Sequence, residues 1–227
     1  MFKFVDRSQT DYLVLIPGWA FDYKIFATLD LPYNYFHFCD QYLANFEDKL
    51  KELLAHNNIK RISLFGWSQG AFAACNFAAK NPSSVEELIL VSVRKKYEPK
   101  NLQNIKKYIS KNKAAYLYSF YRKCFCKNEK DHFCWLKNTL LKDYLGTISS
   151  SHLVANLDYL SQLQIQPELI KKLERVKLVH GTEDKIAPIN EAADIANALP
   201  QAQFICFEHT GHLPFLRKDF SKRLYES

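Results

Sequence analysis

One pentapeptide constrains the fold of this chain more than any other part of its sequence. Residues 66–70 read Gly-Trp-Ser-Gln-Gly, between an apolar run at residues 62–65 and a small-residue helical pattern at residues 71–80. A serine in this setting is typical of a sharp strand-to-helix turn, a nucleophile elbow, where side chains at the flanking glycines would collide with neighbouring backbone. The turn presents the hydroxyl of Ser68. The helix starting at Gln69 offers unpaired N–H groups that can hold a negatively charged oxygen.

Two later segments supply the partners that such a serine needs. The apolar run at residues 176–179 is followed by His-Gly-Thr-Glu-Asp, which puts Asp184 just past a strand end. The strand-like run at residues 204–207 leads into a loop that contains His212. A histidine can take the serine proton, and a buried carboxylate can hold the imidazole in the useful tautomer. We therefore predict a catalytic triad of Ser68, Asp184 and His212.

Each partner has a neighbour that could replace it. His209 lies close to His212, but Gly211 permits a tight loop before His212, whereas His209 continues the strand pattern. Glu183 precedes Asp184, whose side chain is shorter and stiffer. We assign no role to the remaining histidines, since a histidine without such a setting is usually structural: His37, His56, His132, His152 and His180.

The second oxyanion donor is expected after the first central strand. The apolar run at residues 12–16 stops at Pro17 and Gly18. We expect Gly18 to let the chain turn so that the backbone N–H of Trp19 faces Ser68, with the indole forming a wall of the acyl pocket. An ordinary turn with a core tryptophan is the alternative interpretation.

Strand-like and helix-like segments alternate along most of the chain, which indicates a mostly parallel, doubly wound α/β sheet. Helices are predicted at residues 46–56, with Asn45 as N-cap, and at residues 69–80. No strand is apparent from about residue 94 to 167. We therefore divide the chain into a core of residues 1–93 and 168–227 and a helical lid of residues 94–167. Strands are predicted at residues 12–16, 35–39, 62–65, 88–92, 176–180 and 204–207, and the N-terminus alternates like a short strand.

The lid carries most of the positive charge. Residues 94–130 contain twelve Lys and Arg against two Glu, a local net charge of +10, whereas the whole chain carries only +7. This basicity would concentrate an acidic partner near the cleft, although a charge run can also be a solvated face. Nothing resembles a recognition helix or a base-stacking platform, so we expect no nucleic-acid partner.

Length and composition agree with a single enzyme domain, and we expect no cofactor. With 227 residues, 48% of them hydrophobic, the chain can bury a core without metal or disulfide help. The spacing of Cys124, Cys126, His132 and Cys134 does not match usual zinc sites, so we expect no metal and six reduced thiols. Neither a targeting signal nor a bilayer-spanning run is apparent. We expect a cytoplasmic monomer without membrane association.

Four motifs together resemble one family. The segments at residues 16–19, 66–70, 181–184 and 211–215 are similar to those of the pimeloyl-acyl carrier protein methyl ester carboxylesterases of biotin synthesis, within the α/β-hydrolase superfamily. The resemblance implies an α/β-hydrolase fold and hydrolysis of a methyl ester with release of methanol. It also implies a basic helical lid that receives the acidic acyl carrier protein. On this chain it makes Ser68, Asp184 and His212 the triad and the N–H groups of Trp19 and Gln69 the oxyanion hole.

The resemblance extends less firmly into the lid. It implies substrate contacts at Phe120, Tyr121 and Cys124, beside Trp19, and carrier-protein contacts at Arg94, Arg122 and Lys123. A general carboxylesterase or thioesterase with a basic lid of no particular meaning is the alternative within enzymes. A non-catalytic binding protein that kept the hydrolase fold is the alternative outside them.

Overall fold

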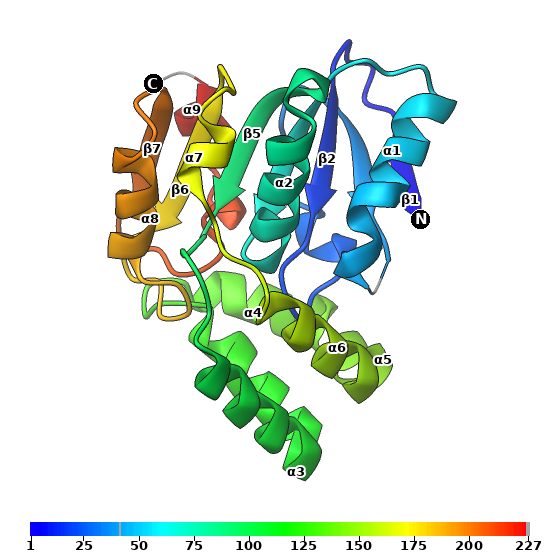
Figure 1. The fold of residues 1–227 in the computed structure, drawn as a ribbon. Helices are drawn as coiled ribbons and strands as arrows, with labels where there is room; N and C mark the ends of the chain where they lie inside the picture. The colour runs from blue at the N-terminus through cyan, green and yellow to red at the C-terminus, as the bar shows by residue number, and fades with distance from the viewer. Residues whose placement is uncertain (41, 226–227) are drawn as a thin grey trace.

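A seven-stranded sheet forms the centre of the molecule (Figure 1). The computed structural model describes residues 1–40 and 42–225. The strand order is β1-β3-β2-β4-β5-β6-β7, and every neighbouring pair is parallel except β1 with β3. The strands are β1 (Phe2–Val5), β2 (Tyr12–Ile16), β3 (Asn34–Phe38), β4 (Ile62–Trp67), β5 (Val85–Val91), β6 (Val176–Gly181) and β7 (Ala202–Phe207).

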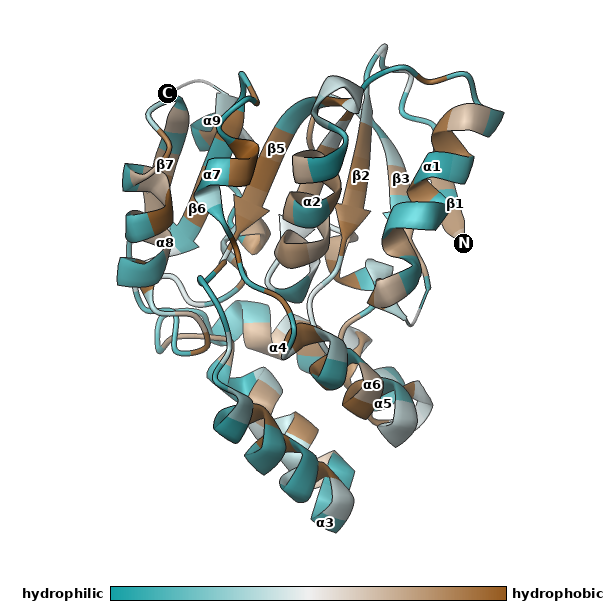
Figure 2. Cartoon of the chain, in the orientation of Figure 1, coloured by the Kyte–Doolittle hydropathy of each residue, from teal (hydrophilic) through white to brown (hydrophobic). Residues whose placement is uncertain are grey.

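The central strands are apolar because both faces of the sheet are covered. Every residue of β4 is buried, and so are four of the five residues of β2. Strands covered on both faces read as continuous hydrophobic runs rather than alternating ones, and β2 and β5 are brown along much of their length in Figure 2. The predicted mostly parallel α/β fold is confirmed. The strand ends differ from the predicted ones by a few residues, and β5 begins at Val85 instead of residue 88.

Helices connect most of the parallel strands. Helices α1 and α2 have the predicted bounds, but the side chain of Asn45 makes no capping hydrogen bond. The chain instead enters α1 through the 3-10 turn η2 (Leu43–Asn45), which leaves Asn45 with near-helical backbone angles. The α-helices are α1 (Phe46–His56), α2 (Gln69–Lys80), α3 (Pro99–Lys123), α4 (Lys130–Thr139), α5 (Leu141–Thr147), α6 (Ser150–Leu160), α7 (Pro167–Ile170), α8 (Ile189–Asn197) and α9 (Phe220–Tyr225).

A helical insertion separates β5 from β6. Helices α3 to α6 lie beyond the carboxyl ends of β2 and β5, and α3 projects away from the sheet (Figure 1). Asn112 has non-helical backbone angles, so α3 consists of two helical stretches. The placement puts the insertion at the edge of the sheet where parallel strands commonly present functional side chains. We keep the name lid for residues 94–167, whose limits stay a prediction.

The structure also bears on membrane association, disulfide bonds and metal binding. No helix within the described residues is long and apolar enough to cross a membrane. All six cysteines are free thiols. Among residues 1–40 and 42–225, no cluster of three or more His, Cys, Asp and Glu is arranged to hold a metal ion.

Candidate active site

The nucleophile elbow joins β4 to α2. Ser68 has φ +53° and ψ −114°, a strained backbone conformation that a non-glycine residue adopts only where its surroundings hold it. A Cβ at Gly70 would lie 2.3 Å from the carbonyl oxygen of Ile16, and one at Gly66 would lie 2.6 Å from the Cα of Ala71. The two glycines are therefore needed because backbone passes close to them, as the sequence pattern indicates.

Ser68, His212 and Asp184 form one hydrogen-bonded series. The Nε2 of His212 lies 2.9 Å from Ser68 Oγ, and its Nδ1 lies 2.7 Å from Asp184 Oδ2. The side chains of His212 and Asp184 are 1% and 0% exposed, so water scarcely reaches this series. With Nδ1 donating to the carboxylate, Nε2 can accept the serine proton. The arrangement can therefore perform nucleophilic attack by Ser68 with His212 as general base.

Asp184 is held in an ionised form. Burial alone would raise its pKa, but the attraction of His212 and the hydrogen bond from His212 outweigh burial and lower the pKa below its ordinary value. Its Oδ1 accepts the backbone N–H groups of Ile186 and Ala187 at 2.8 and 3.0 Å. These two bonds fix the carboxylate plane so that Oδ2 is directed to His212.

His180 is a contact that the sequence did not suggest. Its buried ring lies 3.5 Å from Asp184 Oδ2 and 2.9 Å from the carbonyl oxygen of Ala187. Burial lowers the pKa of His180, which favours the neutral ring. The position of His180 at the end of β6, four residues before Asp184, was the only available signal.

The two competing residues pair with each other away from this series. His209 Nδ1 lies 3.1 Å from Glu183 Oε1, and both side chains are exposed. His209 does not continue the strand, because β7 ends at Phe207 and His209 has φ +52°.

The loop after β2 lies against the elbow, for a different reason from the one expected. Gly18 has no positive φ, so backbone freedom is not what the position requires. A Cβ there would lie only 3.2 Å from the Cβ of Ser68, so the requirement is close approach. The indole of Trp19 donates to the carbonyl of Leu153 in α6 at 3.0 Å, which anchors the loop to the lid.

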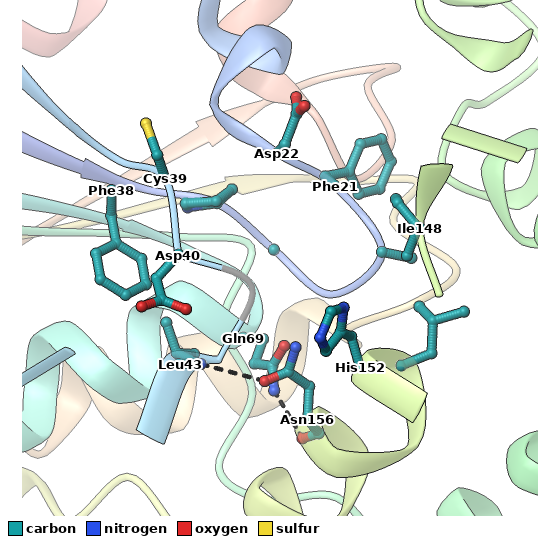
Figure 3. Close-up of a pocket in the computed structure, with 14 residues that line it drawn as sticks. Phe21, Asp22, Phe38, Cys39, Asp40, Leu43, Gln69, Ile148, His152 and Asn156 are labelled. Carbon is teal, nitrogen blue, oxygen red and sulfur yellow. Dashed lines mark hydrogen bonds between the residues drawn. The ribbon is translucent and has the colours of Figure 1, made fainter. Parts of the chain in front are cut away.

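Gln69 is also anchored to the lid. As the first residue of α2 it has no intrahelical acceptor for its N–H. Its side-chain amide donates to the carbonyl of Asn156 at 2.8 Å, and the Asn156 side chain accepts from Leu43 (Figure 3). These contacts border a small cavity of about 100 Å³ behind the loop after β2. The oxyanion role of the Trp19 and Gln69 N–H groups stays a prediction.

A larger pocket of about 420 Å³ opens on Ser68. Trp19 and Phe120 line it as expected, with their rings edge to face at 5.0 Å. Burial raises the pKa of Tyr97, another lining residue, to about 12, so its hydroxyl stays protonated at neutral pH. Lining residues that the sequence did not indicate include Tyr97, Leu102, Ile105, Tyr116, Leu157 and Lys185.

Two of the expected substrate contacts occupy other positions. Tyr121 is fully buried, and its hydroxyl donates to the carbonyl of Ala20 at 2.6 Å. Cys124 is also fully buried, and burial raises the pKa of its thiol well above the ordinary value. Neither residue lines the pocket, because Tyr121 in the last turn of α3 and Cys124 directly after it are both buried in the packing between lid and core.

The expected carrier contacts separate into two kinds. Arg94 forms an ion pair with Glu191 at 2.5 Å and stacks on Tyr97, so it lies in the pocket wall and not on an open surface. Arg122 and Lys123 are exposed at the end of α3. The Arg122 guanidinium lies over the ring of Phe133, and Lys123 lines the mouth of the pocket.

Sequence comparison places the chain among hydrolases. The family model described as serine aminopeptidase, S33, matches residues 33–219. A pimeloyl-acyl-carrier-protein methyl ester esterase from Nitrosomonas europaea is 28% identical over 181 residues, which cover 74% of this chain and 71% of that protein. A protein of the same name from Aliivibrio fischeri is 23% identical over 228 residues, covering 90% and 87%.

Solved structures agree on the fold. An esterase from Exiguobacterium antarcticum superposes with a TM-score of 0.83 at 16% identity, covering 99% of this chain and 94% of that one. An enol-lactonase from Burkholderia xenovorans gives 0.83 at 12% identity, covering 100% and 95%. At these identities the likeness establishes the α/β-hydrolase fold.

Proposed function

The chain belongs to the family described as serine aminopeptidase S33, and from this premise we propose that it is a serine carboxylesterase acting on the methyl ester of pimeloyl-acyl carrier protein. The observation that carries the reaction type is the buried hydrogen-bonded series of Ser68, His212 and Asp184. Two relatives named for that substrate, matched over most of the chain, support the substrate.

The reaction proceeds in two steps. Ser68 Oγ attacks the ester carbonyl while its proton passes to His212 Nε2, and the N–H groups of Trp19 and Gln69 hold the oxyanion. Methanol leaves with the proton from His212, and Asp184 stabilises the imidazolium in the meantime. Water then attacks the acyl-enzyme by the same route and regenerates Ser68.

The lining of the pocket favours an acyl chain over a peptide N-terminus. A peptide substrate cut from its amino end presents an ammonium group, which a carboxylate would recognise. Among the described residues that line the 420 Å³ pocket there is no Asp or Glu, whereas Arg94, Lys123 and Lys185 are present. Aromatic and aliphatic side chains supply the rest of its wall. A neutral acyl chain that bears a distant negative group fits a pocket with apolar walls and cationic side chains.

Exposed lysines extend the positive surface from the pocket mouth along α3. Lys100, Lys107 and Lys111 are exposed there, in line with a partner of acidic character. Other lid lysines are already paired within the chain, Lys95 with Asp194 and Lys106 with Asp158. This pairing is the observation that favours the alternative of a general carboxylesterase whose basic lid is simply solvated.

Methanol release distinguishes the proposed methyl esterase from a general carboxylesterase. The purified protein is assayed on pimeloyl-acyl carrier protein methyl ester and on a short p-nitrophenyl ester, with Ser68→Ala as control. We expect Ser68-dependent turnover that favours the carrier-bound ester. Fast p-nitrophenyl hydrolysis without demethylation would leave a general esterase. An absence of Ser68-dependent turnover on both would leave a binding protein.

A further inference from the structure

The turn between α3 and α4 packs against the loop that carries His212. We call residues 124–129 the lid turn. Its Cys124 carbonyl accepts the backbone N–H of His212 at 2.7 Å, and its Cys126 thiol donates to the carbonyl of His209 at 3.0 Å. Part of the lid therefore touches the backbone of the predicted general base directly.

A buried carboxylate completes this contact. Oε2 of Glu129 accepts the N–H of Gly211 at 2.8 Å and the N–H of Cys126 at 2.8 Å. The Glu129 side chain is only 4% exposed. One oxygen thus joins the lid turn to the residue immediately before His212, and bonds to an ionised acceptor are stronger than neutral ones.

The absence of a side chain at Gly211 allows this contact. A Cβ at Gly211 would lie 2.5 Å from the Cys124 carbonyl oxygen and 2.9 Å from Oε2 of Glu129. A side chain there would push the lid turn away from the loop. The glycine before His212 therefore serves the approach of the lid.

The core holds the same loop from other directions. The indole N–H of Trp67 donates to the carbonyl of His212 at 2.8 Å, and the Glu183 N–H donates to the carbonyl of Thr210 at 2.9 Å. Those bonds fix carbonyl groups of the loop. The N–H groups of Gly211 and His212 are fixed by the lid turn.

Glu129 is ionised in this setting. Burial acts to raise its pKa, but His132 and the backbone N–H groups of Cys126 and Gly211 together hold the pKa below its ordinary value. Its other oxygen, Oε1, lies 3.9 Å from Nδ1 of His132. A stable negative charge is therefore available to the two N–H donors at neutral pH.

We propose that Glu129 is a positioning residue, a buried lid carboxylate that holds the backbone of Gly211 and thereby the imidazole of His212 against Ser68. The inference rests on the proposed function in one respect, that Ser68 reacts through His212. It makes the lid part of the catalytic geometry as well as a cover for the pocket.

Two substitutions distinguish the effect of side-chain length from the effect of charge at position 129. Glu129→Gln keeps the length and an acceptor oxygen but removes the charge, whereas Glu129→Asp keeps the charge but is too short to reach Gly211. The second-order rate of Ser68 labelling by a fluorophosphonate and the kcat and KM for p-nitrophenyl acetate are measured well below each variant's Tm. Asp131→Asn, at an exposed acid two residues away, is the matched control.

We expect Glu129→Asp and Glu129→Ala to lower the labelling rate and kcat by up to about 100-fold, because small misplacements of catalytic groups cost that much. KM should stay within about twofold, and Glu129→Gln should retain most of the activity. Normal labelling of all folded variants, with only Tm lowered, would overturn the inference alone. A wild-type protein that is not labelled at Ser68 would overturn the proposed function and this inference with it.

Discussion

The elbow and the lid contribute to one pocket by different physical means. At the elbow, Ser68 and its partners are buried, and strand ends and close backbone contacts fix their positions. In the lid, Arg122 and Lys123 are exposed, and their positions depend on few contacts. We therefore expect the buried part to determine which bond is attacked and the exposed part to determine which molecule is presented.

The segments of the lid differ in how deeply they are buried. In the lid turn, Cys124, Phe125, Cys126 and Glu129 are buried and the turn bonds to the His212 loop, while α3 projects away from the sheet (Figure 1). We therefore expect chemistry and recognition to be divided according to burial and not according to position in the sequence.

Removing the nucleophile should have the largest effect on the buried side. Ser68→Ala should lower kcat for any ester on the order of a million-fold, because the attacking oxygen is lost. The measurement is methanol release, with Tm and circular dichroism as controls for folding. Turnover within a hundredfold of wild type would place the nucleophile elsewhere.

Replacing Asp184 should have the second-largest effect. Asp184→Asn should lower kcat by about 10,000-fold, since the amide no longer holds His212 in the useful tautomer. Glu183→Gln is the matched control, because Glu183 is adjacent and pairs with exposed His209. If Glu183→Gln were the damaging change, the orienting carboxylate would be misassigned.

Burial in the core also predicts a pH effect on stability. Desolvation, with a smaller contribution from Lys3, lowers the pKa of His37 to about 4. Unfolded His37 takes up a proton near pH 6.5 and folded His37 only near pH 4. The contribution of His37 to the free energy of unfolding is therefore fully present above pH 6.5 and falls, by about 3 kcal/mol, as the pH drops through this window.

Denaturant unfolding between pH 7 and pH 4 measures that loss. His37→Phe should remove most of it, because the ring lies among Tyr23, Phe26 and Tyr35. His56→Phe, at an exposed histidine of α1, should leave it unchanged. An equal effect of both substitutions would contradict the role of burial.

Changes on the exposed lid should have the smallest effect and the most selective one. Reversing Arg122 and Lys123 to Glu should raise KM for the carrier-bound ester by about tenfold and leave kcat nearly unchanged, because steering charges act on encounter. Lys95→Glu, at a lysine already paired with Asp194, is the control. An equal rise in KM for a small neutral ester would argue against carrier docking.

The parts of the site that depend on neighbouring residues could be predicted from the sequence. Gly66 and Gly70 flank Ser68 because backbone crowds them, and this requirement is visible in five residues. The sheet was predictable for a similar reason, because buried parallel strands such as β2 and β4 are continuous apolar runs. Asn45 occupies the predicted N-cap position, but its side chain makes no capping hydrogen bond, because the preceding 3-10 turn changes its backbone angles.

The lid residues were less predictable because their roles depend on contacts across the fold. Tyr121 and Cys124 were expected in the pocket, but both side chains are buried in the packing between lid and core. Arg94 was expected to contact a carrier protein, but Glu191, far along the chain, pairs with it.

By itself, the sequence determined the α/β class, the elbow and the candidate triad, because strand periodicity and turn chemistry are written in neighbouring residues. Only the tertiary structure decided which side chains line the pocket and which lid cations stay exposed, and only it brought Glu129 to the His212 loop. Glu129 and Gly211 are 82 positions apart. No short-range pattern specifies such a contact, because it exists only once the insertion has packed on the carboxyl edge of the sheet.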